Sequence, residues 1–172
     1  AADQAAQVVA RDLAHRLRAR VGDRLVVVAA PPLTTTWLIW FGGFQGLGTL
    51  YWENAEGLRA VAALLSASDE AGAREVLERH GVTHLLVPSW EPFAPAGTAV
   101  PGSTRMGEAE RSRPMEGGFL ARALATGSLP DWLVPVPHAV PTTPALRTLG
   151  VRLYDVVGEG RQGGTSERPD GP

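Results

Sequence analysis

Hydroxyl, indole, carboxylate and amide side chains follow three of the strands that the sequence predicts. These side chains belong to Thr34, Thr35, Trp52, Glu53, Asn54, Ser89, Trp90 and Glu91. Ligands of parallel α/β sheets bind outside the carboxyl ends of the strands, so we expect these residues to share one rim of the sheet. Indole faces beside carboxylates and an amide suit a sugar, through ring stacking and hydrogen bonds to its hydroxyls. The sequence therefore predicts a ligand-binding rim, with a glycan as the ligand class.

Two other interpretations of the rim remain open. Glu53 and Glu91 could serve as the acid and the nucleophile of a glycosidase, which needs a pair of carboxyl groups. The residues could equally be structural, with Thr34 and Asn54 as helix caps, Ser89 in a turn and the tryptophans packed into the domain. We predict no catalytic residue.

The stretch GGFQGLG, residues 42–48, has the spacing G-G-x-x-G-x-G. The dinucleotide fingerprint is G-x-G-x-x-G, and it follows a strand and opens a helix. Here the glycines precede a predicted strand instead. We interpret the stretch as the end of a helix and a tight turn into that strand.

The composition excludes several kinds of chemistry. The net charge is −2, so no overall basic field attracts nucleic acid or an anionic membrane. Every basic residue is arginine, which rules out a lysine Schiff base and a Walker-type phosphate loop. Cysteine is absent, and the histidines (His15, His80, His84, His138) are scattered, so we expect neither a metal site nor a cofactor.

Helices alternate with apolar, β-branched strands along the chain, which predicts a parallel sheet with helical crossovers. We expect a three-layer, Rossmann-like α/β domain with a small, mostly parallel sheet of about four strands. The expected strands are 24–30, 47–52, 82–87 and 151–157, and proline-rich residues 130–141 are expected to be extended chain. The domain should span 1–157, with a long flexible loop at 92–118, and 158–172 should be a disordered tail.

Four segments together resemble a known kind of domain. They are LGTLYWENAEGLRAVAALLSA, VLERHGVTHLLVPSWEPF, FLARAL followed by LPDWLVPVP, and VRLYDVV. These segments are similar to the soluble carboxyl-terminal domains of uncharacterised bacterial multi-pass membrane proteins. Those proteins in turn resemble the C-superfamily glycosyltransferases, which use polyprenyl-phosphate sugar donors. The resemblance covers about residues 5–157 without the variable loop.

The resemblance implies that the chain is a piece of a longer protein in which a transmembrane bundle, its partner, precedes Ala1. It implies a location on the extracytoplasmic face of the bacterial inner membrane, either periplasmic or outer. Catalytic carboxylates of such transferases lie in loops of the bundle, so the implied role is accessory, with a glycan or a polyprenyl-linked sugar as the ligand. Trp52-Glu53-Asn54 departs from the acceptor-binding Trp-Trp-Asp motif of oligosaccharyltransferases, and we do not transfer that role.

Two alternatives to an accessory domain follow from the residues. One is a self-contained, glycosidase-like hydrolase that uses Glu53 and Glu91. The other is a structural or interaction domain without a ligand. The longest apolar run, LVVVAAPPL, is too short to cross a bilayer.

Overall fold

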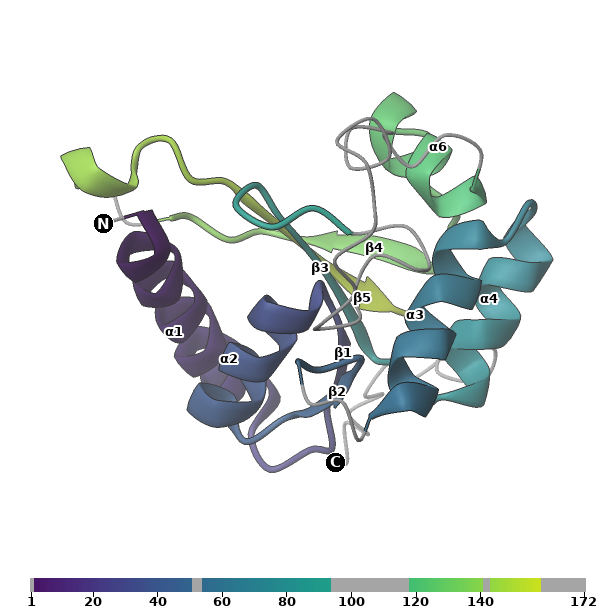
Figure 1. Ribbon diagram of the computed structural model, residues 1–172, viewed down its shortest axis with the longest axis horizontal. Coiled ribbons are helices and arrows are strands. Elements are labelled where there is room, and N and C mark those ends of the chain that lie inside the picture. Colours follow the sequence, from purple (N-terminus) through teal and green to yellow (C-terminus); the bar gives the residue numbers. More distant parts are fainter. Residues whose placement is uncertain (1, 51–53, 94–117, 141–142, 159–172) are drawn as a thin grey trace, which may run out of the picture.

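A computed structural model describes residues 2–50, 54–93, 118–140 and 143–158 (Figure 1). Trp52 and Glu53 lie outside these residues. Almost all of the expected 92–118 loop and of the expected 158–172 tail lies outside them too, so the predictions for those segments stay predictions.

The described residues form helices and strands in an alternating order. In chain order they are α1 (Ala2–Val21), β1 (Val27–Ala29), α2 (Pro32–Gly42), β2 (Gln45–Leu47), α3 (Ala55–Ser66), α4 (Glu70–Arg79), β3 (His84–Pro88), α6 (Phe119–Thr126), β4 (Leu133–Val136), the 3-10 helix η1 (Pro144–Leu146) and β5 (Val151–Val156). The α/β class predicted from the sequence is confirmed.

The five strands form one sheet in the order β2-β1-β3-β5-β4. Strand β1 pairs in parallel with β2 and β3, whereas β5 pairs antiparallel with both β3 and β4. Four strands therefore run in one direction and β5 runs against them. A parallel neighbour needs a crossover, usually a helix, and only η1 separates β4 from β5, so the chain returns antiparallel.

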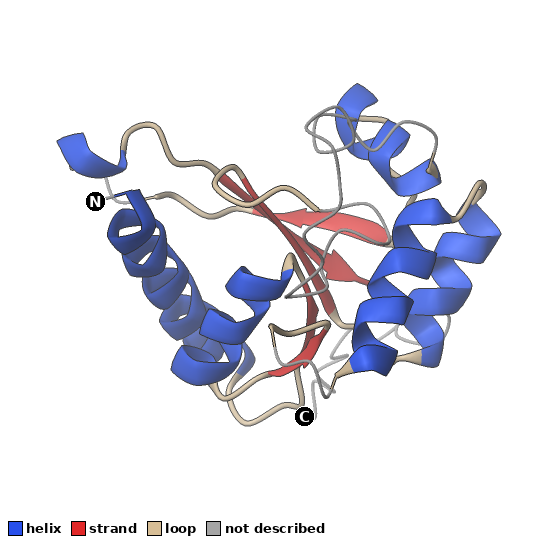
Figure 2. Ribbon diagram, in the orientation of Figure 1, coloured by secondary structure: helices blue, strands red, loops and turns tan. Residues whose placement is uncertain are grey.

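Helices cover both faces of the sheet, which gives the three expected layers. Helices α1 and α2 lie on one face, and α3, α4 and α6 lie on the other (Figures 1 and 2). Neighbouring strand residues alternate between the two cores. Leu85 packs with the α3–α4–α6 core and Leu86 with the α1–α2 core, and in β5 Leu153 and Tyr154 divide in the same way. Burial on both faces explains the continuous apolar runs of β1 and β3.

Two strands differ from those that the sequence predicts. The second strand occupies Gln45–Leu47 rather than 47–52, because Gly48 adopts a φ of +74° and ends it. The proline-rich segment contains a strand that we did not predict, β4, in which Pro135 stands opposite Tyr154. β4 lies at the edge of the sheet, where the missing N–H of a proline is tolerated.

Candidate functional site

The carboxylate of Glu91 lies at the amino-terminal end of α2. Its Oε1 accepts a hydrogen bond from the backbone N–H of Leu33 at 2.8 Å. Its Oε2 accepts from the N–H of Thr34 at 2.7 Å and from the Thr34 hydroxyl, also at 2.7 Å. The N-cap residue Pro31 makes no side-chain capping bond, so the cap of this helix comes from the chain after β3. A carboxylate there satisfies free N–H groups and complements the positive end of the helix dipole.

Trp90 extends the same hydrogen-bond chain. Its Nε1–H donates to Oγ1 of Thr34 at 3.1 Å, and that hydroxyl donates onward to Glu91. Thr34 is fully buried, whereas Trp90 is half-buried and keeps part of its ring accessible. The structure thus brings together three residues of the predicted rim, one from α2 and two from the carboxyl end of β3.

The remaining described rim residues make separate structural contacts. Thr35 is fully buried, and its hydroxyl donates to the carbonyl of Ala30 at 2.9 Å. The Ser89 hydroxyl accepts from the N–H of Gly150 at 2.8 Å, which ties the end of β3 to the start of β5. Asn54 caps α3, with Oδ1 accepting from the N–H of Gly57 at 3.0 Å, as its position in the sequence predicts.

These contacts limit what the rim can do chemically. Each oxygen of Glu91 already accepts at least one hydrogen bond, so this carboxylate acts as a helix cap and an anchor for Trp90. A nucleophile or general acid needs an oxygen that can reach a substrate, and the hydrolase alternative is therefore not favoured.

The glycine-rich stretch serves the same architecture. Gly43 ends α2 in the left-handed conformation, with a φ of 62°, and its N–H donates to the carbonyl of Ile39 at 2.9 Å. A Cβ on Gly46 would come within 2.3 Å of the Thr35 methyl carbon, so glycine lets β2 lie against α2. The interpretation as a helix end is confirmed, whereas the strand lies within the stretch, at Gln45–Leu47, rather than after it.

A polar network that the sequence did not reveal lies at the other end of the parallel strands, away from the predicted rim. Asp155 accepts from Arg20 Nη2 at 2.6 Å and pairs with the buried His84 Nε2 at 3.0 Å. The other ring nitrogen of His84 lies 2.8 Å from the Thr83 hydroxyl. This network borders a cavity of about 500 Å³ beside the amino ends of β1 and β3. The one sequence signal for it was a histidine within an apolar strand.

A second histidine lies beside α1. The Nε2 atom of His138 is buried without a hydrogen-bond partner among the described residues, next to a cavity of about 270 Å³. Burial lowers the pKa of His138 below its usual 6.5, as does the nearby Arg16, while Asp12 opposes both effects. Desolvation disfavours the charged imidazolium, which is why burial dominates.

The lowered pKa predicts a pH dependence of stability. Between the pKa of folded His138 and 6.5, the unfolded chain binds more protons than the folded protein. The free energy of unfolding should therefore rise with pH through that window and gain nothing more from this group above it. The test is urea denaturation of the wild type and of His138→Gln at several pH values from 4.5 to 8. The substitution should remove the rise of the free energy of unfolding with pH. His15→Gln, on the exposed side of α1, should keep it, and an equal slope in wild type and His138→Gln would contradict the prediction.

The described residues hold no group of three or more His, Cys, Asp or Glu side chains arranged to bind a metal ion, and none of their helices is long and apolar enough to cross a bilayer. No protein-family model matches the sequence, and no curated protein matches it.

A solved structure has a similar fold. It is the C-terminal globular domain of an oligosaccharyltransferase from Archaeoglobus fulgidus, with a TM-score of 0.53 at 12% sequence identity. The match covers 85% of this chain and 95% of that domain. The chain therefore shares the fold of an oligosaccharyltransferase C-terminal globular domain.

Proposed function

We propose that this chain is an extracytoplasmic accessory domain of a membrane-embedded, glycosyltransferase-like protein and is not catalytic by itself. The observation that carries the proposal is the fold likeness to the oligosaccharyltransferase domain, which extends over 95% of that domain. The engagement of Glu91 as a helix cap supports the non-catalytic part. The partner in this proposal is the transmembrane bundle of the same parent chain.

The rim at the carboxyl ends of β1 and β3 is the proposed contact with a glycan or a polyprenyl-linked sugar. Trp90 supplies a half-buried aromatic face that a hydrogen bond to Thr34 holds in place. Aromatic faces of this kind stack on the apolar faces of sugar rings, and a preorganised ring loses little freedom on binding. The predicted set is completed by Thr35, Trp52, Glu53, Asn54, Ser89 and Glu91.

The coding sequence upstream of Ala1 tests the membrane part of the proposal. Several apolar windows of about 19 residues are expected there. An upstream sequence that encodes only a start codon or a cleavable signal would overturn the proposal.

Ligand binding by the rim is tested on the purified chain by thermal unfolding with soluble oligosaccharides and short-chain polyprenyl phosphates. A ligand at 100 times its dissociation constant should stabilise the folded state by about 2.7 kcal/mol. Trp90→Ala should abolish this shift, whereas Trp40→Ala, at the other end of α2, should keep the shift with the soluble oligosaccharides. If none of these ligands shifts the unfolding temperature, the alternative of a structural domain without a ligand is supported. If the chain hydrolyses aryl glycosides and Glu91→Gln loses that activity, the hydrolase alternative is supported.

A further inference from the structure

Helix α2 presents an unusual surface to its surroundings. Its eleven residues, PLTTTWLIWFG, include no charged side chain. One side packs into the protein through Thr34, Thr35, Leu38 and Gly42. On the outer side Trp40 is 82% exposed, the largest exposed fraction among the large apolar side chains of the described residues. A helix that is apolar all round is normally buried, so within the part of the chain that the structure describes α2 lacks a partner on its outer side.

The exposed tryptophan belongs to a larger apolar patch. Leu33, Trp37 and Trp40 follow each other at the four- and three-residue spacing that places side chains on one face of a helix. Leu50, which is 53% exposed, is held beside that face because its N–H donates to the Thr36 hydroxyl at 3.3 Å. We call Leu33, Trp37, Trp40 and Leu50 the α2 patch.

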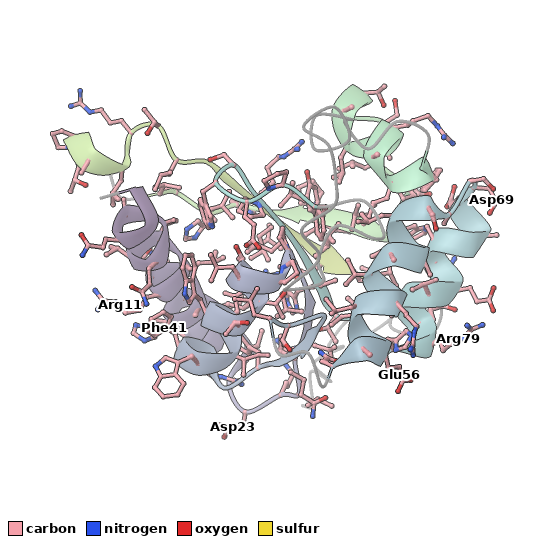
Figure 3. All side chains as sticks on the ribbon, in the orientation of Figure 1. Arg11, Asp23, Phe41, Glu56, Asp69 and Arg79 are labelled. Carbon is pink, nitrogen blue, oxygen red and sulfur yellow. The ribbon has the colours of Figure 1, made fainter. Side chains whose placement is uncertain are left out.

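Cationic groups border the carboxyl end of α2, where Trp40 lies. The Arg18 guanidinium donates to the carbonyl of Gly42 from Nε at 2.9 Å and from Nη2 at 2.8 Å. Arg11 is exposed on α1, and Figure 3 shows it on the same flank as Phe41 of α2.

Among the described residues, two of the anionic groups near α2 are already bonded, and a third, Asp23 in the turn after α1, is exposed. Glu91 at the far end of the helix accepts three hydrogen bonds, and Asp12 on α1 is paired with Arg16 at 2.9 Å. Arg11 and Arg18 outnumber Asp23 there, so the end of α2 that carries Trp40 is apolar with a net positive border, which complements an anionic surface.

From this combination we infer that the α2 patch rests on the headgroup region of an anionic lipid bilayer. Indole rings favour the boundary between headgroups and acyl chains, because their apolar body and polar N–H suit its two sides. Arginines at that boundary are attracted to the negative surface potential of the headgroups. The inference rests on the proposed function, because a membrane has to lie next to the domain. It adds that the α2 patch is the face of the domain that contacts this membrane.

Vesicle co-sedimentation of the purified 172-residue chain tests the inference. We expect binding to vesicles of mixed phosphatidylcholine and phosphatidylglycerol, and weaker binding to phosphatidylcholine alone. Trp40→Ser should lower the partition coefficient by roughly tenfold or more, since the apolar area of the ring no longer leaves water. Arg11→Gln should lower it about fivefold on the anionic vesicles and little on the neutral ones.

Val134→Ser is the matched control. Val134 is 42% exposed and lies in β4, at the edge of the sheet away from β2, so its removal should leave vesicle binding unchanged. Absence of binding by the wild type, or equal binding by Trp40→Ser, would overturn the inference. So would a dimer in analytical ultracentrifugation that Trp40→Ser dissociates while no vesicle binding is seen, because the patch would then join two copies of the chain.

Failure of this inference differs from failure of the proposed function. A chain that does not bind vesicles refutes the role of the α2 patch, while apolar spans upstream of Ala1 would still support the accessory domain. An upstream sequence without such spans refutes the proposed function even if the purified chain binds vesicles through Trp40.

Discussion

Glu91→Ala is expected to lower the free energy of unfolding by about 2–3 kcal/mol, a large effect for one partly exposed side chain. The substitution leaves the N–H groups of Leu33 and Thr34 and the buried Thr34 hydroxyl without their acceptor. Hydrogen bonds to a charged group are each worth more than neutral ones, and the negative charge also complements the helix dipole. Urea denaturation followed by circular dichroism measures the change.

Two variants separate the cap from a general effect of losing a glutamate. Glu91→Gln keeps one acceptor oxygen but loses the charge, so we expect roughly half the loss. Glu56→Ala removes an exposed glutamate from the first turn of α3, labelled in Figure 3, where Asn54 makes the capping bond. It should change stability by less than about 0.5 kcal/mol. Equal effects of Glu91→Ala and Glu56→Ala would show that the hydrogen bonds of Glu91 contribute nothing.

A double-mutant cycle tests whether Glu91 acts through Thr34. Thr34→Val removes the hydroxyl that donates to Glu91 and accepts from Trp90. Because each single change removes the bond from the Thr34 hydroxyl to Glu91, Glu91→Ala and Thr34→Val together should cost less than the sum of the single changes. Additive losses would mean that the two side chains contribute independently.

The elements that the sequence predicts correctly depend on neighbouring residues. Helix α3 follows from Asn54 and an apolar stripe three and four residues apart, and the end of α2 follows from Gly43. Strands β1 and β3 follow from apolar runs long enough to be buried on both faces. In each case the signal and the structure lie within one element.

The misplaced features depend on contacts between distant residues. Glu91 accepts from the N–H of Leu33, 58 residues earlier in the sequence, and no local pattern distinguishes such a cap from a catalytic carboxylate. Asp155 meets Arg20 across 135 residues of sequence. Strand β2 contains Gly46 because α2 lies close to it, so packing rather than β-propensity decides its position.

The rim also shows why residue types alone overestimate chemistry. Hydroxyls, an indole and a carboxylate do gather at the carboxyl ends of β1 and β3, as the topology requires. They gather, however, to satisfy the unpaired N–H groups at the start of α2. The carboxyl ends of the strands suit a ligand, but the helix that begins there also needs polar side chains to cap it. Only the hydrogen bonds show whether a side chain is available to a ligand or caps the helix.

Gly118→Ala should destabilise the protein by about 2–4 kcal/mol, for a steric reason. Gly118 precedes α6 with φ −69° and ψ 145°, a conformation that alanine adopts without strain. A Cβ there would nevertheless lie 1.9 Å from the carbonyl oxygen of Leu65, at the end of α3. The neighbouring N–H of Phe119 donates to the carbonyl of Ala67 at 2.7 Å, so the start of α6 is bonded to the chain that follows α3.

Gly150→Ala provides the control. A Cβ on Gly150 would meet the Ser89 side chain at an ordinary 3.9 Å, so its stability should change by less than about 0.5 kcal/mol. In Gly118→Ala, hydrogen exchange should show that backbone amides lose protection mainly in α6 and at the end of α3. The reason is that the backbone of one helix has to move away from the other. If both substitutions changed the free energy of unfolding equally little, the start of α6 would not lie as close to Leu65 as described. The packing of Leu120 and Leu124 against the α3–α4 layer would then need another explanation.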